Sequence, residues 1–435
     1  MPDKPPGPSQ NVAHRRRWYR ALHWQIAIGL LVGVLAGALL NAFQAPIGDV
    51  AHGHPAKAFA LVDAVGAIFL RLLKMIVVPL IMASIISGIG SLKGGSLGRL
   101  ALRTIAWYVL TTALAVGAGL AVVNLVHPGA GLTPESVTGV EAPAEIAMHR
   151  GAGLGAALLQ VLLDIVPDNL GTAVVQFHML QIVFVSLFLG AVALRAGEAA
   201  DPFFRFFESL NAVAFQAVDL IIRLAPIAVA ALIAKELWQF SFSRLGALGG
   251  YFACVILGLA LHGLVTLPLL IRLFARRSPW EYLGQMREAL ALAFSTASSG
   301  ATLPVTIRCQ VERGGIRQQI ASFVTPLGAT VNMDGTALYE AVAAIFLANV
   351  YLVHPLDATQ QLVVFVTAVL AAVGAAAIPH AGLVMMVVVL SAVGIPLEGI
   401  GLILAVDRVL DMCRTTINVW GDCACAAVID QQTGR

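Results

Sequence analysis

Five polar side chains recur along one face of the last apolar segment of the chain. Asp407, Asp411, Arg414, Asn418 and Asp422 follow one another at steps of four, three, four and four residues, so a helix would place them in one stripe. A charged group at membrane depth costs about 2.5–3.5 kcal/mol on insertion scales, so such groups must face partners, water or a ligand instead of lipid. The stripe therefore predicts a binding site.

The composition of the chain indicates that this segment lies in a membrane. Hydrophobic residues make up 59% of the chain and charged residues only 12%, which is typical of a polytopic membrane protein. The formal net charge is +3, and the basic tract at 14–20 reports topology, so nucleic-acid binding is not expected. The five cysteines lie in or beside apolar segments, which indicates neither a disulfide framework nor a metal site.

Apolar stretches of about 20 residues are long enough to span a bilayer as helices. We expect such spans near 24–44, 64–90, 104–126, 156–196 (with an interruption), 208–234 and 249–273. Lysine and arginine are concentrated in alternate connections, which predicts a cytoplasmic N-terminus. A cleaved secretory signal is the alternative for the first span, but that run is long and leads into further spans.

After residue 280 the apolar segments are interrupted by runs of small residues. The run STASSGATLP lies within 282–312, and the run GAAAIPHAG lies within 358–395. Non-helical backbone at membrane depth is tolerated only where protein buries it or where it lines a cavity, so each run predicts the tip of a re-entrant hairpin. A pair of such segments indicates a transporter with an inverted repeat. Proline or glycine kinks in ordinary helices are the alternative.

A run of oxygen-bearing side chains lies between the two hairpins. Thr330, Asn332, Asp334 and Thr336 belong to a sequence, GATVNMDGT, whose Asn, Asp and Gly residues disfavour regular helix. Oxygen ligands suit a hard cation such as sodium, so we interpret the run as a cation site. A polar network that only joins helices is the alternative.

Four motifs, in their order and spacing, resemble one transporter family. SSGATLP, NMDGT, AAIPHAGLV and DMCRTTINVWGD look like the dicarboxylate/amino acid:cation symporters, the family of the excitatory glutamate transporters and their archaeal and bacterial relatives. The resemblance covers nearly the whole chain and includes Tyr108, Thr111 and Thr112 of the third span, which alone would be interpreted as structural. It implies an all-α polytopic protein with eight transmembrane helices and two re-entrant hairpins in inverted repeats. It also implies a homotrimer within the lipid of the cell (inner) membrane, with both termini cytoplasmic.

The resemblance further implies a scaffold and a transport domain that moves as an elevator. A cytoplasmic N-terminus (1–23) precedes scaffold spans 1 and 2 (24–100), and span 3 belongs to the transport domain (101–126). Spans 4 and 5 return to the scaffold (127–248). The transport domain continues over 249–430, with span 6, the hairpin at 282–312, span 7, the hairpin at 358–395 and span 8, before a tail at 431–435.

By the same resemblance, Asp411 takes the α-ammonium of the substrate and Arg414 takes its side-chain carboxylate. A desolvated ammonium requires a carboxylate, and the planar guanidinium suits bidentate pairing. The other expected substrate contacts come from both hairpins and from spans 7 and 8, namely Ser298, Ser299, Thr336, Ile378, Ala381, Gly382, Thr415 and Asn418. Because a neutral side chain would leave a buried guanidinium without its counter-charge, aspartate or glutamate is the expected substrate. A C4-dicarboxylate or a neutral amino acid is the alternative.

Sodium is the expected co-transported ion, and the resemblance assigns three sites to it. The first comprises Gly328, Asn332, Asn418 and Asp422; the second comprises Tyr108, Thr111, Thr112, Asn332 and Asp334; the third uses backbone oxygens of Thr330, Met333, Ala372, Val373 and Ala375. Glu340 aligns with the proton-carrying glutamate of the mammalian branch, and a desolvated carboxyl can alternate between neutral and charged forms. Proton coupling beside sodium is therefore expected, with coupling to protons alone as the alternative.

Some positions depart from the family pattern. Ala297 and Met412 stand where relatives carry a stabilising arginine, and the absence of that arginine from span 8 argues against potassium counter-transport. His380 stands at a hairpin position usually held by a smaller or amide residue. Asp407 is interpreted only as support for the ion site of span 3. An intramembrane hydrolase is not expected, because the motifs that hold the serines and Asp411 contain no base.

Overall fold

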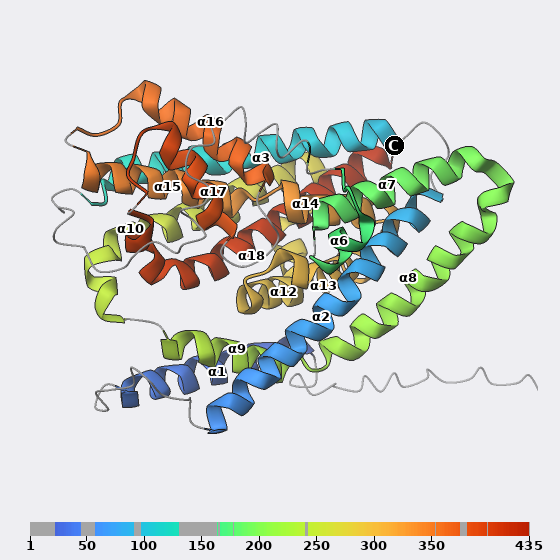
Figure 1. Cartoon of the computed structure of the whole chain (residues 1–435), viewed down its shortest axis with the longest axis horizontal. Coiled ribbons are helices and arrows are strands. Elements are labelled where there is room, and N and C mark those ends of the chain that lie inside the picture. The colour runs from blue at the N-terminus through green and yellow to red at the C-terminus, as the bar shows by residue number, and fades with distance from the viewer. Residues whose placement is uncertain are drawn as a thin grey trace, which may run out of the picture.

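The computed structural model describes residues 22–44, 57–90, 97–129, 163, 166–176, 178–239, 242–352, 354–374, 381–397 and 399–434. All regular elements within these ranges are helices, which agrees with the expected all-α class. The helices of the first half of the chain are α1 (Leu22–Gln44), α2 (Lys57–Gly90), α3 (Leu97–Val126), α6 (Leu170–Val175), α7 (Met179–Ala196), η3 (Gly197–Ala200), α8 (Asp201–Ile222) and α9 (Ala225–Gln239). Figure 1 shows α2 and α8 side by side as a tilted pair, with α1 against α9.

The second half of the chain forms a more closely packed set of helices. These are α10 (Phe242–Leu261), η4 (His262–Thr266), α11 (Leu267–Leu270), η5 (Ile271–Ala275), α12 (Pro279–Thr296), α13 (Ser299–Glu312), α14 (Gln318–Val331), α15 (Asp334–Tyr351), α16 (Ala358–Gly374), α17 (Ala381–Ala392) and α18 (Gly399–Thr433). The helix α15 lies at the centre and contacts α3, α10, α16, α17 and α18. Nearly all its side chains are buried, so a polar group on α15 must find its partners inside the protein.

Small residues bring α1 and α9 into direct backbone contact. A methyl group at Gly33 would lie 2.6 Å from the Ala230 carbonyl oxygen, and one at Gly37 would lie 2.7 Å from the Ala234 carbonyl oxygen. Glycines four residues apart form a groove along one helix face, which is how membrane helices pack closely without a hydrophobic driving force between them.

The expected span at 208–234 is wrong as a single helix. The chain forms α8 up to Ile222 and a new helix, α9, from Ala225, with a turn at 223–224. Pro226 explains the break, because proline lacks the backbone N–H of a regular helix and disfavours helical backbone in the residue before it.

The predicted interruptions at 295–304 and in the NMDGT run are confirmed. The helix α12 ends at Thr296, Ala297 has a left-handed φ of 48°, and extended Ser298 caps α13 by accepting a hydrogen bond of 3.2 Å from the Ala301 N–H. The two helices then pack side by side as a hairpin. Between α14 and α15, Asn332 and Met333 have non-helical backbone. The helices α16 and α17 also pack together, but the tip at 375–380 lies outside the described residues.

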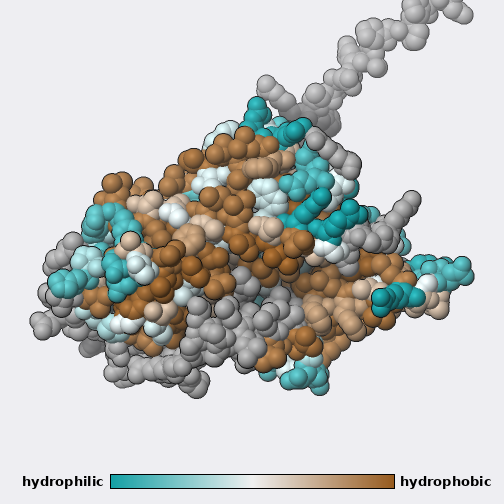
Figure 2. All heavy atoms as spheres, turned by 90° about the horizontal axis from the view of Figure 1, so that it is seen from above, coloured by the Kyte–Doolittle hydropathy of each residue, from teal (hydrophilic) through white to brown (hydrophobic). Residues whose placement is uncertain are grey.

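The surface of the protein is that of a multi-pass membrane protein. Within the described ranges, five helical stretches are long and apolar enough to cross a bilayer, namely Gln25–Ala42, Ala64–Ser87, Gly98–Val126, Gln181–Ile222 and Leu248–Ala275. Hydrophobic side chains cover much of the face in Figure 2. Large exposed residues such as Leu39 of α1, Leu220 of α8 and Leu257 of α10 suit contact with lipid. Eight spans, re-entrant insertion of the hairpins, the inverted repeat and the domain boundaries stay predictions.

Candidate functional site

Non-helical backbone from the first hairpin and from the α14–α15 break meets the middle of α18. The Ser299 hydroxyl donates to the Ala329 carbonyl over 3.2 Å, which joins the hairpin turn to the end of α14. On the other side, Asn418 of α18 accepts from the Gly335 N–H over 2.7 Å and donates to the Thr336 hydroxyl over 3.2 Å. These contacts involve three of the predicted site residues, Ser299, Thr336 and Asn418, from three separate segments.

Arg414 is the only arginine among the largest fully buried side chains of the described structure. Its Nη2 donates to Asp411 Oδ1 over 2.7 Å, and its guanidinium carbon lies 3.9 Å from the centre of the Tyr339 ring. A methyl group at Gly382 of α17 would lie 2.8 Å from Arg414 Nη1 and 2.9 Å from Thr336, so this glycine covers the guanidinium closely. Arg414 is therefore held between α15, α17 and α18.

Two nitrogens of this arginine remain available to a ligand. Within the part of the chain that the structure describes, Arg414 Nε and Nη1 have no hydrogen-bond partner although both are buried. An unsatisfied buried donor costs about 1–3 kcal/mol, and more when it is charged. A charged donor is satisfied best by an anionic acceptor, so these two nitrogens suit an acidic ligand.

Asp407 lies beside Arg414. Its Oδ1 is 3.3 Å from Arg414 Nη2, and its side chain is fully buried. The spacing accounts for this contact, because residues seven apart lie two turns apart on one helix face. Support of the α3 ion site by Asp407 stays a prediction. Asp407 and Asp411 together give the guanidinium two carboxylate partners.

A second group of polar residues connects α3, the α14–α15 break and α18. Thr112 donates to Asp334 Oδ1 over 2.8 Å, Thr111 donates to Asn332 Oδ1 over 3.1 Å, and Asn332 donates to Asp422 Oδ1 over 3.0 Å. Thus four of the five residues predicted for the second sodium site, and two of those predicted for the first, form two hydrogen-bonded sets, Thr112 with Asp334 and Thr111 with Asn332 and Asp422. We call these five residues the oxygen cluster.

Tyr108 and Gly328 border the oxygen cluster. The Tyr108 hydroxyl donates to the Val324 carbonyl over 2.6 Å. A methyl group at Gly328 would lie 2.6 Å from that hydroxyl oxygen and would overlap Asp422 Oδ1. Only glycine therefore lets α14 approach Tyr108 and Asp422 so closely. Asn418 lies one turn from Asp422 on α18, next to the residues that surround Arg414.

The predicted substrate and sodium residues differ slightly in exposure. The hydroxyl, amide and acidic side chains predicted to bind substrate are 5–6% exposed, namely Ser298, Ser299, Thr336, Asp411, Thr415 and Asn418. The oxygen cluster is 0–3% exposed, and Arg414 is 1% exposed, so both groups of predicted residues are buried.

Three groups of predicted site residues are described less fully. Thr330, Met333 and Ala372 are buried near the ends of α14 and α16, and Thr330 donates to the Leu327 carbonyl over 3.0 Å. Ala375 and Ile378 lie outside the described residues, as does His380, and only the backbone is described for Val373 and Ala381. Glu340 is fully buried on α15, and neither carboxylate oxygen has a hydrogen-bond partner among the residues described.

His262 is a polar residue of this region that the sequence analysis missed. Its Nε2 lies 3.1 Å from Asp334 Oδ2, and the side chain is fully buried. The signal was a single histidine within the otherwise apolar run LALHGLVT. A lone polar residue at membrane depth could have identified it, because such residues face the protein interior.

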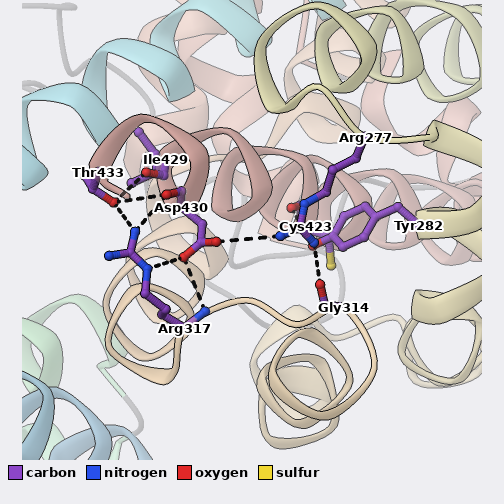
Figure 3. Close-up of polar contacts among 8 residues, drawn as sticks. All are labelled: Arg277, Tyr282, Gly314, Arg317, Cys423, Ile429, Asp430 and Thr433. Carbon is purple, nitrogen blue, oxygen red and sulfur yellow. Dashed lines mark hydrogen bonds and ion pairs between the residues drawn. The ribbon is translucent and has the colours of Figure 1, made fainter. Parts of the chain in front are cut away.

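A cluster of charged residues anchors the far end of α18 (Figure 3). Asp430 accepts from Arg317 Nε over 2.8 Å and lies 3.6 Å from Arg277 Nη2. Arg277 also donates to the Gly314 carbonyl, and Tyr282 donates to the Cys423 carbonyl over 3.0 Å. These contacts tie α18 to the start of α12 and to the α13–α14 connection, so they hold the stripe of α18 in register with the hairpin.

Comparisons with known proteins match nearly the whole chain. The model of the sodium:dicarboxylate symporter family matches residues 22–432. Excitatory amino acid transporter 4 of Mus musculus is 36% identical over 434 residues, which cover 85% of this chain and 77% of the relative. Neutral amino acid transporter B(0) of Bos taurus is 35% identical over 434 residues, covering 93% and 79%. Excitatory amino acid transporter 2 of Homo sapiens is 34% identical over 450 residues, covering 92% and 77%.

Proposed function

Since the chain belongs to the sodium:dicarboxylate symporter family, whose members are transporters and not enzymes, we propose that it imports aspartate or glutamate together with sodium. The choice of substrate rests on one observation: the buried side chain of Arg414, beside Asp411, has two hydrogen-bond donors, Nε and Nη1, without partners in the described structure. A substrate with an ammonium and an additional carboxylate satisfies both side chains. Transport of amino acids by relatives supports this choice over a plain C4-dicarboxylate.

Charge supports the requirement for a cation. Asp334 and Asp422 both belong to the buried oxygen cluster, and no lysine or arginine contacts either carboxylate within the described residues. Two buried carboxylates without a fixed cation are unfavourable, so bound sodium would stabilise them. The substrate adds a further negative charge, which makes sodium binding and substrate binding mutually favourable.

The hydrogen bonds also support coupling through the backbone. Asn418 contacts Gly335 and Thr336, which begin α15, while Asp334 at the same helix start belongs to the oxygen cluster. An ion bound by Asn332 and Asp334 would fix the non-helical residues 332–333. Residues 332–333 lead directly into the start of α15, where Thr336 contacts Asn418. A bound ion would therefore also order these two substrate residues. The third sodium site, at the ends of α14 and α16, is part of this proposal.

Proton coupling and the elevator movement complete the proposal. Glu340 is a fully buried carboxyl whose oxygens lack partners among the described residues, which suits a group that carries a proton. The helices α1, α2, α7, α8 and α9 pack mainly on one another, whereas α3 packs on α15, and this grouping supports a scaffold and a separate transport unit. We include the homotrimer, the cell membrane location and the cytoplasmic termini in the same proposal.

Uptake by purified protein in liposomes tests the function. Labelled aspartate and glutamate are offered under an inward sodium gradient, with a potassium or choline gradient of equal ionic strength as control. We expect accumulation only with sodium, and competition by the other acidic amino acid but not by serine or alanine. Equal uptake without sodium would contradict the ion assignment, and competition by serine would favour the neutral amino acid named for the Bos taurus relative. Collapse of a proton gradient with an ionophore separates proton coupling from sodium coupling.

A further inference from the structure

His262 lies on a short π-helical segment that packs tightly on α18. The segment η4 (His262–Thr266) follows α10 without a break, and π-helical turns are frequent at functional sites. Trp420 of α18 donates its indole N–H to the Gly263 carbonyl over 3.0 Å. A methyl group at Gly263 would overlap the Ile417 side chain, so glycine allows this close contact. The backbone that carries His262 is therefore fixed against the helix that carries Asp422.

The two oxygens of Asp334 are held by different helices. Oδ1 accepts from Thr112 of α3 over 2.8 Å, and Oδ2 lies 3.1 Å from His262 Nε2. A carboxylate only accepts hydrogen bonds, so the histidine nitrogen is the donor. A methyl group at Gly421 would lie 2.7 Å from Oδ2, so glycine at this position lets the carboxylate pack closely on α18. The two contacts hold Asp334 through both of its oxygens.

This orientation matters for a cation because a carboxylate can bind a metal with one oxygen or with two. With Oδ2 occupied by His262, Oδ1 faces Thr112 and the adjacent pair of Thr111 and Asn332. We propose that His262 is a positioning residue of the sodium site, which holds Asp334 Oδ2 so that Oδ1 serves the ion. This inference rests on the proposed sodium coupling and assigns a role to a residue outside the predicted ligands.

The location of His262 separates its role from substrate binding. Within the described residues its only polar partner is Asp334, whereas the substrate residue Arg414 contacts Asp411 and Asp407. Some residues do not touch a metal ion but hydrogen-bond to one of its ligands. Removal of such a residue typically lowers metal affinity by about 10- to 100-fold. A change at His262 should therefore shift the sodium requirement and leave intrinsic substrate affinity nearly unchanged.

Two amide substitutions provide a matched test. His262→Gln places an N–H near the position of Nε2 and can still reach Asp334, whereas His262→Asn places it near the position of Nδ1 and cannot. Sodium alone is titrated against the melting temperature of the purified protein, and aspartate binding is then measured at saturating sodium. We expect His262→Asn to raise the half-saturating sodium concentration about tenfold or more, and His262→Gln to stay within about threefold of the parent protein. Aspartate affinity at saturating sodium should change by no more than about twofold in either variant.

Three outcomes would overturn the positioning role. These are an unchanged sodium requirement in His262→Asn, equal shifts in the two variants, or a loss of aspartate affinity at saturating sodium as large as the sodium shift. His262→Leu, which has similar volume and no donor, replaces the asparagine variant if that protein does not fold. A parent protein that sodium does not stabilise would contradict the proposed function itself, so the two failures are distinguishable.

Discussion

Replacement of Arg414 by glutamine tests the recognition of an acidic side chain. The guanidinium has two buried donors, Nε and Nη1, without partners in the described structure, and its Nη2 is already held by Asp411. A hydrogen bond to a charged group contributes about 1.5–3 kcal/mol, so two such bonds from the guanidinium to the acidic substrate are worth about 3–6 kcal/mol. Since about 1.4 kcal/mol corresponds to a factor of ten, Arg414→Gln should weaken aspartate binding by about 100-fold to 10,000-fold.

Competition binding at saturating sodium measures this change. Labelled aspartate is displaced by aspartate, glutamate and serine in the parent protein, in Arg414→Gln and in Arg414→Lys. The lysine variant keeps a positive charge beside Asp407 and Asp411 but lacks the planar fork, so its loss should be intermediate. As a control that does not require aspartate binding, the melting temperature is titrated with sodium alone. Sodium should still raise it in both variants, because the oxygen cluster does not contain Arg414. Aspartate affinity in Arg414→Gln within about threefold of the parent would refute the assigned role.

Three further predictions concern the sodium site, the proton and the contact between helix groups. Gly328→Ala should raise the half-saturating sodium concentration about tenfold or more in a melting-temperature titration. The reason is that its methyl group would overlap Asp422 and lie 2.6 Å from the Tyr108 hydroxyl oxygen. An unchanged titration would contradict the sodium site. Glu340→Gln should leave sodium-dependent uptake in place but abolish acidification of the liposome lumen, measured with a trapped pH dye, and persistent acidification would exclude Glu340 as the carrier. Asp219→Asn removes an ion pair of 2.8 Å between α8 and Arg308 of α13. Because both side chains are partly exposed, the free energy of unfolding should fall by no more than about 1 kcal/mol, whereas turnover should rise if α13 moves past α8. The control is Glu312→Gln, which removes the other carboxylate partner of Arg308, 3.1 Å away on the same helix, and keeps Asp219 on α8.

The parts of the site that the sequence predicted are those with strong local signals. The break at Asn332 and Met333 followed from a run of poor helix formers, and the turn at Ala297 and Ser298 followed from small residues within an apolar segment. Both features depend on nearby residues, so a single sequence contains the information. The stripe of α18 was equally predictable, because one uninterrupted helix, Gly399–Thr433, carries all its members.

The parts that the sequence did not predict depend on packing between distant segments. His262 meets Asp334 only because Gly263 and Gly421 allow η4, the α14–α15 break and α18 to approach closely. The contact between Asp407 and Arg414 was not predicted, although their spacing places both on one helix face. The division of 208–234 into α8 and α9 depends on Pro226, whose effect on a long apolar run was underestimated.

The central claim is that an acidic amino acid and sodium cross the membrane together. The most direct test measures the uptake of radiolabelled sodium into liposomes that contain the purified protein, with and without external aspartate, at zero membrane potential. We predict that aspartate or glutamate stimulates sodium uptake, that serine does not, and that Arg414→Gln abolishes the stimulation. Aspartate uptake that proceeds with no accompanying sodium flux would contradict the account.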